Sequence, residues 1–347
     1  MNGSDPTPVR QAVEVLTSRN RTHSVDQMLD GRVAVVTGAG RGIGRAEATR
    51  LAAYGARVVV NDLGVATDGS STSESPAEET VAAITAAGGT AVADRSDIST
   101  IEGGAALIER ALAEWGQIDI VVNNAGFGRP RMVFNMAPEE WDDVVRVHLR
   151  GTFAVSAPAC RWWREQHKAG RPVHGRIVNT STGLLLYGGA GQSNYAAAKA
   201  GALAFTESIA TEMAPYGVTA NCIMPSAATR LANIGWRTSR NAKRHDVDFD
   251  PTDPVHVAEM VCYLASPAGQ WISGQCFQVR GGIVEHVRTF AVDHVIERSD
   301  HGWTVADLAE ELPRMFGAGA RRADPPPNDW QEAYRAKGSA STSPGTA

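Results

Sequence analysis

A tyrosine and a lysine four residues apart are the side chains in this sequence best suited to proton transfer. Tyr195 and Lys199 open an alanine-rich run that predicts a helix, and this spacing places both side chains on one helical face. We expect the lysine ammonium to stabilise the phenolate, lowering the pKa of the tyrosine from about 10 toward the working pH. The chain has only 6 tyrosines and 4 lysines, so a chance pair is disfavoured. Such a phenol can act as a general acid or base.

A glycine-rich turn is the second candidate for chemistry. Gly38, Gly42 and Gly44 lie between a β-branched run at 33–37 and a helix-forming run that starts near Ile43. This arrangement turns backbone N–H groups and the positive end of a helix dipole toward a pyrophosphate. A glycine cluster taken alone is equally compatible with an ordinary tight turn. Its place between a strand and a helix favours dinucleotide binding.

Together these motifs resemble the short-chain dehydrogenase/reductase family. The resemblance rests on the T-G-x-x-x-G-x-G turn at 37–44, the Asn-Asn-Ala-Gly element at 123–126 and the Tyr-x-x-x-Lys helix, and it covers about 30–283. It implies an oxidoreductase that transfers hydride reversibly between NAD(P)(H) and a carbonyl or secondary alcohol. The substrate would be a ketoacyl compound, a steroid-like ketone or a ketone of secondary metabolism. A catalytically weak NAD(H)-binding sensor or assembly protein on the same fold is the alternative.

The resemblance also implies roles for individual residues. Thr182 stands where the family has a serine thirteen residues before the tyrosine, and its hydroxyl would polarise the substrate carbonyl. Ser181 is the competing hydroxyl, but the alternation of side chains along a strand turns it to the opposite face. The expected catalytic residues are Thr182, Tyr195, Lys199 and His148. The expected cofactor-binding residues are Gly38, Arg41, Gly42, Ile43, Gly44, Asp62, Leu63, Asp97, Ile98, Asn124, Ala125, Gly126, Tyr195, Lys199, Pro225 and Ala228.

Two positions depart from the pattern of the family. His148 stands where an asparagine is usual, and it can be a proton relay or a structural side chain. Ser226 follows Pro225 where glycine is common, which affects the nicotinamide pocket. The segment 147–153, the turn at 61–64 and the polar loop that follows it at 64–76 resemble, more weakly, the hydroxyacyl-CoA dehydrogenase part of peroxisomal multifunctional enzymes. A second long loop without clear periodicity lies at 225–253. We place substrate recognition in that loop.

The choice between NAD and NADP depends on two side chains of opposite charge. Asp62 ends the second expected strand, where a carboxylate can accept hydrogen bonds from the ribose hydroxyls and repel a 2′-phosphate. Arg41 in the glycine turn can instead pair with that phosphate. The sequence therefore predicts NAD as the cofactor, with NADP possible, and no metal.

The elements that carry these residues alternate along the chain. Short β-branched runs separated by helical patterns predict a Rossmann-like, doubly wound α/β fold with a parallel sheet of about seven strands. The expected strands are 33–37, 57–61, 90–93, 118–122, 176–179, 218–223 and 276–279. The expected helices are 43–54, 77–87, 101–115, 139–164, 195–214 and 254–265, with a further short helix near 304 that Thr304 and Asp307 would cap.

Composition limits the classes of partner. We expect a flexible N-terminal extension at 1–30, a single catalytic domain at 31–284, a C-terminal extension with a short helix at 285–321 and a disordered tail at 322–347. A net charge of −5 without long blocks of one sign argues against nucleic acid or membrane partners. Four separated cysteines and the lack of a signal-like segment predict buried free thiols and a cytoplasmic location. We expect a small-molecule substrate and a homo-oligomer, a dimer or tetramer.

Overall fold

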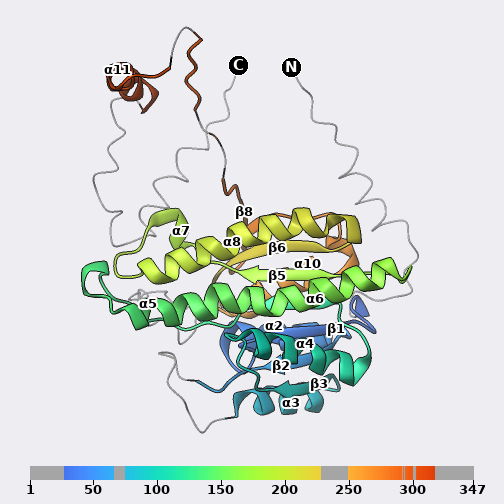
Figure 1. The fold of residues 1–347 in the computed structure, drawn as a ribbon. Coiled ribbons are helices and arrows are strands. Elements are labelled where there is room, and N and C mark those ends of the chain that lie inside the picture. The colour runs from blue at the N-terminus through green and yellow to red at the C-terminus, as the bar shows by residue number, and fades with distance from the viewer. Residues whose placement is uncertain are drawn as a thin grey trace, which may run out of the picture. The chain divides into compact units, whose positions relative to one another are not determined.

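The computed structural model describes residues 27–65, 75–227, 249–290 and 302–316, with 292 and 294–299 between the last two ranges (Figure 1). The expected tail, nearly all of the expected N-terminal extension and most of the long loop at 225–253 lie outside these ranges. Among the described residues, no helix combines the length and the apolar character needed to cross a membrane.

An eight-stranded sheet forms the centre of the fold. Its spatial order is β3-β2-β1-β4-β5-β6-β7-β8, and every pair is parallel except the last. The order reverses direction between β1 and β4, which is the switch point of a doubly wound sheet. The strands are β1 (Val33–Thr37), β2 (Arg57–Asn61), β3 (Thr90–Asp94), β4 (Ile120–Asn123), β5 (Arg176–Thr180), β6 (Thr219–Ser226), β7 (Cys276–Arg280) and β8 (Ile283–Val287). All seven expected strands are present, so the expected fold class is confirmed.

Helices cover both faces of this sheet, and the sheet separates the hydrophobic core into two parts (Figure 1). Because side chains alternate along a strand, Ala34 and Val36 of β1 enter one core while Val33 and Val35 enter the other. The first core lies against α2 (Gly42–Ala53), α3 (Pro76–Ala86) and α10 (Val255–Ala265). The second lies against α4 (Ile101–Trp115), α6 (Gly151–Lys168) and α8 (Ser193–Met213).

Two local features differ from the expectation. The single helix expected at 139–164 consists of α5 (Pro138–Val145), a π-helical turn η3 (Arg146–Arg150) and α6. A short helix, α7 (Leu184–Tyr187), precedes α8. Single π-turns inside α-helices frequently occur at functional sites.

The added strand β8 follows from a two-residue hairpin. Arg280 pairs with Ile283, so Gly281 and Gly282 alone form the turn, and Gly281 has a positive φ of 51° that favours glycine. β8 continues to Val287, past the domain boundary expected at residue 284.

The described residues divide into two compact units, one within 1–185 and 189–287 and the other within 186–188 and 288–347. In the second unit, Thr304 caps α11 (Val305–Phe316). Its hydroxyl accepts the Asp307 N–H at 3.2 Å, and the Asp307 carboxylate accepts the Thr304 N–H at 3.0 Å. This reciprocal cap confirms the expected helix start.

The four cysteines are free thiols. Cys222, Cys262 and Cys276 are buried as expected, whereas Cys160 on α6 is only half-buried.

Candidate active site

The glycine turn follows β1 at the carboxyl edge of the sheet. Gly38 has a positive φ of 63°, and a Cβ built on it would lie 2.7 Å from Ala125 Cα. A Cβ on Gly44 would collide with the Gly38 carbonyl oxygen and the Asn124 amide group. A side chain at either position would therefore fill the space between this turn and the loop after β4. Gly42, also at positive φ, begins α2, so the turn directs a helix N-terminus outward.

Hydrogen bonds fasten the glycine turn to the loop after β4. The Thr37 hydroxyl accepts the N–H groups of Asn124 and Ala125, both at 3.1 Å. The Asn124 side chain donates to the carbonyl oxygens of Thr37 and Gly38, at 3.0 and 3.2 Å. The expected cofactor residues Gly38, Gly44, Asn124 and Ala125 are thus brought together. Gly126 lies close by, against the ring of His148.

Asp62 follows β2 and lies beside the same turn. Its Oδ2 accepts the Gly40 N–H at 2.9 Å, and its Oδ1 accepts the Gly64 N–H at 2.8 Å. These two bonds fix the carboxylate next to the glycines. Leu63 beside it is 44% exposed, which leaves an apolar side chain open to a ligand. Arg41 precedes α2, and Ile43 on α2 packs against the first core.

Asp97 and Ile98 follow β3 and have different surroundings. The Asp97 carboxylate accepts the Ser99 N–H at 3.0 Å and lies 3.9 Å from the Arg146 guanidinium. Ile98 is 8% exposed and packs in the second core. Asp97 therefore has an accessible carboxylate, whereas Ile98 is mainly a packing residue.

Thr182 and Tyr195 meet at the carboxyl edge after β5. Tyr195 is half-buried on the first turn of α8, and Thr182 follows β5. Burial raises the pKa of Tyr195 to about 12, while a hydrogen bond with the Thr182 side chain acts in the lowering direction. Ser181 is turned away as expected, because its hydroxyl donates to the Lys199 carbonyl oxygen at 3.0 Å. Thr182 is therefore the hydroxyl that faces the tyrosine.

Lys199 lies one turn behind Tyr195 and is 3% exposed. Its Nζ donates to the Thr180 carbonyl oxygen at 2.7 Å and lies 5.8 Å from the centroid of the Tyr195 ring. Burial lowers the pKa of Lys199 to about 8, against the opposing effects of Cys222 and Glu47. The expectation that Lys199 lowers the pKa of Tyr195 is wrong for the protein alone. Desolvation of the phenol is the larger effect on its pKa.

His148 lies in the π-turn η3 and is 1% exposed. Its Nε2 is 2.8 Å from the Phe127 carbonyl oxygen, and its ring meets the Tyr195 ring edge-on with centroids 5.1 Å apart. Burial, reinforced by the charge of Lys199, lowers the pKa of His148 to about 3, so the imidazole is neutral at pH 7. The Nδ1 atom is buried without a hydrogen-bond partner.

Two buried polar side chains at this edge were not anticipated from the sequence. Asn194 is 1% exposed, accepts the Tyr195 N–H at 2.8 Å, and donates to the carbonyl oxygens of Arg129 and Glu140. Glu47 on α2 is fully buried, and neither carboxyl oxygen has a partner. Burial raises its pKa to about 8, opposed by the charge of Lys199. The available signal for Glu47 was its spacing of three and four residues from the buried Gly44 and Leu51.

The last expected cofactor residues lie where β6 ends. Pro225 and Ser226 pair with Val279 and Arg280 of β7, so the strand continues through the position where glycine is common in the family. Ala228 lies outside the described residues, as do residues 228–248 of the expected substrate loop.

A doubly wound sheet with a Tyr-Lys pair and a glycine turn at its carboxyl edge defines a dinucleotide-dependent oxidoreductase. Residues 32–233 match the family described as short chain dehydrogenase. The chain belongs to this family, and it catalyses NAD(P)-dependent oxidoreduction of a carbonyl or alcohol group.

Several relatives are similar over most of the chain. Hydroxyacyl-CoA dehydrogenase ChsB1 of Mycobacterium tuberculosis is 43% identical over 307 residues, which cover 87% of this chain and 94% of that protein. The 3-oxoacyl-[acyl-carrier-protein] reductase FabG of Vibrio cholerae is 36% identical, over 74% of this chain and 98% of that protein. A crystal structure of a short chain dehydrogenase from Mycobacterium avium has a TM-score of 0.74 and 44% identity, covering 84% of this chain and 96% of that one.

Part of a larger enzyme also matches. Peroxisomal multifunctional enzyme type 2 of Drosophila melanogaster is 40% identical over 235 residues, which are 68% of this chain but 36% of that protein. This match confirms the weaker resemblance seen in the sequence. These relatives are named as dehydrogenases, reductases or multifunctional enzymes, so the alternative of a non-catalytic sensor gains no support.

Proposed function

We propose that the chain interconverts a hydroxyacyl thioester and the corresponding oxoacyl thioester, with NAD as the cofactor. The observation that carries this proposal is the contact between the Thr182 and Tyr195 side chains, with the Lys199 ammonium one turn behind. Two hydroxyl groups within hydrogen-bond reach of each other can both donate to a single carbonyl oxygen. The acyl thioester is chosen because similar proteins are named as hydroxyacyl-CoA and oxoacyl-carrier-protein enzymes.

Tyr195 would move the proton. Its phenol, with a pKa of about 12 in the protein alone, is protonated at neutral pH and can donate to the carbonyl oxygen during reduction. Thr182 would donate a second hydrogen bond to that oxygen and stabilise the charge that develops there. In oxidation the same proton returns to Tyr195. A nicotinamide bound beside these groups supplies or accepts the hydride.

The residues at the carboxyl edge fit a dinucleotide. The close approach of Gly38 and Gly44 to the loop after β4 leaves no room for side chains, which suits backbone contact with a pyrophosphate. Lys199 uses one of its three donors on Thr180, so two remain for ribose hydroxyls. Gly42, Arg41, Ile43, Leu63, Asp97, Ile98, Ala125, Gly126 and Pro225 would complete the site.

Asp62 supports NAD over NADP. Its carboxylate is held at the glycine turn by the Gly40 N–H, where an additional phosphate on the ribose would meet a like charge. Arg41 acts in the opposite direction, because a guanidinium can pair with that phosphate. We propose that the fixed carboxylate dominates.

His148 would position Tyr195 rather than relay protons as a cation. Its pKa of about 3 keeps the ring neutral, and its edge-on contact limits how the Tyr195 ring can tilt. The bond from Nε2 to Phe127 ties the same ring to the loop after β4.

A homo-oligomer is also proposed. Phe153 on α6 is 47% exposed, and its ring lies 6.2 Å from that of Phe205 on α8, so two neighbouring helices share an apolar outer patch. Light scattering should give a multiple of the single-chain mass of 36.8 kDa. A mass of one chain at micromolar concentration would contradict this. We further propose that 31–284 is the catalytic part of the chain and 285–321 an extension of it.

The substrate proposal is tested with the full chain and NADH. The rate of NADH oxidation is measured with oxoacyl-CoA thioesters, with the matching free oxoacids, and with cyclic ketones that lack a thioester. We expect kcat/KM to be highest for the thioesters. A preference for cyclic ketones would show that the substrate is a ketone without a thioester, with the same carbonyl reduction. If NADH were oxidised with none of these carbonyl compounds, the proposed function would be contradicted.

A further inference from the structure

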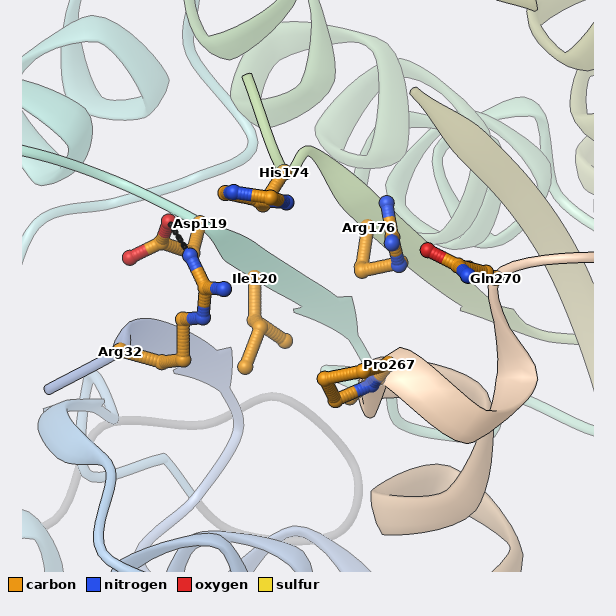
Figure 2. A pocket seen from close by; sticks show the side chains of 8 residues that line it. Arg32, Asp119, Ile120, His174, Arg176, Pro267 and Gln270 are labelled. Atoms are coloured by element: carbon orange, nitrogen blue, oxygen red, sulfur yellow. Dashed lines mark hydrogen bonds and ion pairs between the residues drawn. The ribbon is translucent and has the colours of Figure 1, made fainter. Parts of the chain in front are cut away.

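A small cavity opens at the amino edge of the sheet, at the opposite ends of the strands from the active site (Figure 2). Its volume is about 90 Å³. The side chains around it come from the residues that start β1, β4 and β5 and from the segment after α10. They include Arg32, Asp119, His174, Arg176 and Gln270.

One arginine of this cavity is paired with a carboxylate. Arg32 Nη1 lies 3.3 Å from Asp119 Oδ1, as the dashed line in Figure 2 shows. The Asp119 carboxylate also accepts the Val33 N–H and the Gln117 amide, both at 2.9 Å. Asp119 is 7% exposed, so this carboxylate is largely committed to its present neighbours.

The second arginine has no carboxylate of its own. Arg176 is 5% exposed, and its Nη1 donates only to the carbonyl oxygens of Gly175 and Gly217, at 2.8 and 3.3 Å. Its Nε is buried without a hydrogen-bond partner. Burial and the charge of Arg32 lower the pKa of Arg176, and only Asp119 opposes them. An additional negative charge beside Arg176 would stabilise its buried guanidinium in the charged form.

The remaining wall of the cavity is polar and open. His174 is exposed. Partial burial of its ring and the charges of Arg32 and Arg176 lower its pKa, so the neutral imidazole can donate or accept a hydrogen bond in the cavity. Figure 2 shows the Gln270 side chain beside the guanidinium of Arg176. Two guanidinium groups, an imidazole and an amide around a small opening suit an ion with several oxygen acceptors.

We propose that this cavity binds a small oxyanion, with inorganic phosphate as the probe, through Arg176 and Arg32. The cavity admits one such ion but not a nucleotide. The ion would contact the guanidinium of Arg176 from the side of Gln270. It would give Arg176 the negative partner that it lacks, because Asp119 is paired with Arg32. Because a five-residue strand separates the two edges by roughly 16 Å, this site is independent of the cofactor and of the proposed reaction.

Phosphate binding is measured by calorimetry on the full chain at constant ionic strength, with saturating NADH present so that the glycine turn is filled. We expect saturable binding of one phosphate per chain. A terminal phosphate of a larger ligand could present the same oxygens, so glycerol phosphate is titrated in parallel. Tighter binding of glycerol phosphate would assign the site to a phosphomonoester. The absence of saturable phosphate and glycerol phosphate binding would overturn the proposal.

Gln270→Glu locates the site. The new carboxylate would lie beside Arg176 and occupy the place of the ion, so we expect phosphate affinity to fall at least about tenfold while NADH binding is unchanged. Asn135→Asp, an exposed amide-to-carboxylate change after β4, is the matched control and should leave phosphate affinity at the parent value. Equal affinities in Gln270→Glu and the parent would overturn the proposal. Arg176→Gln should also lose binding, with NADH binding as the check that it folds.

Discussion

Asp119 at the amino edge of the sheet and Glu47 on α2 are both buried carboxyl groups, yet their surroundings differ completely. Asp119 accepts two N–H donors and pairs with Arg32. Glu47 has no hydrogen-bond partner, and burial raises its pKa to about 8. The amino edge thus holds most of its charges in partnered form, with Arg176 as the exception.

The carboxyl edge keeps polar groups desolvated and incompletely paired. Tyr195, Lys199 and His148 all have pKa values moved toward the neutral form, to about 12, 8 and 3 respectively, and burial is the first cause in each case. Free donors and acceptors in a buried site cost stability but are available to a ligand. The comparison teaches that the same strands are stabilised at one end and prepared for chemistry at the other.

The largest expected effect is on turnover after Tyr195→Phe. Removal of the phenolic oxygen deletes the proton donor and keeps the ring against His148, so kcat should fall about 10²–10⁴-fold with little change in NADH affinity. Tyr216→Phe, at a half-buried tyrosine whose ring meets His167, is the control and should turn over at the parent rate. A parent-like rate for Tyr195→Phe would remove Tyr195 from the mechanism.

Glu47→Gln tests the cost of the unpaired carboxyl group. The folded chain keeps the Glu47 proton up to about pH 8, whereas the unfolded chain releases it near 4.5. The stability contributed by neutral Glu47 is therefore present at low pH and lost as the pH rises between these values. Above pH 8 the variant should be more stable than the parent by roughly 5 kcal/mol, and the two should converge below pH 4.5.

Denaturant unfolding across this pH range measures the difference. Glu114→Gln, at an exposed carboxylate paired with Arg110, is the control and should show no such window. Parallel stability curves for Glu47→Gln and the parent would show that Glu47 is not held neutral by burial.

Substitutions at Thr182 separate its hydroxyl from its shape. Thr182→Val keeps the branched side chain but removes the donor, so kcat should fall about 10²–10³-fold, as expected for loss of one donor to a developing oxyanion. Thr182→Ser retains the hydroxyl and should turn over at least as well as the parent. Single-turnover rates with a substrate that the parent reduces rank the parent and the two variants. Equal rates for the valine and serine variants would assign the carbonyl contact to another group.

The smallest effect concerns cofactor choice. Asp62→Asn removes the charge that opposes a ribose phosphate but keeps a side chain able to hydrogen-bond the hydroxyls. The ratio of NADPH to NADH affinity should rise about tenfold relative to the parent. Fluorescence titration of both cofactors provides the measurement. Parent protein that binds NADPH at least about tenfold more tightly than NADH would contradict the role given to Asp62.

Much of the fold could be predicted because its strands are short runs of β-branched residues bounded by turns. β8 was missed, although Gly281-Gly282 between two apolar runs is a hairpin signal. The π-turn at His148 could not be seen, because the periodic pattern continues through 139–164 without a break. The local geometry there follows from packing against Phe127 and Tyr195.

Motif spacing singled out the candidate residues that the fold brings to the carboxyl edge, but their electrostatics could not be predicted from it. A lysine near a tyrosine lowers the pKa of the phenol only when the attraction between ammonium and phenolate outweighs the desolvation of the phenol. Here burial has the larger effect on the pKa of Tyr195, and burial also lowers the pKa of Lys199. Burial depends on the complete three-dimensional environment, which spacing within one helix does not report.

The central claim is that the carboxyl edge transfers hydride to the carbon of a carbonyl group while Tyr195 protonates its oxygen. The most direct measurement uses NADH carrying deuterium at the reactive position, an oxoacyl-CoA thioester and the full chain, with the product analysed by mass spectrometry. We predict a hydroxyacyl thioester carrying that deuterium on the carbinol carbon, and no product from Tyr195→Phe on the same time scale. Product without deuterium, or equal product from both proteins, would contradict the account.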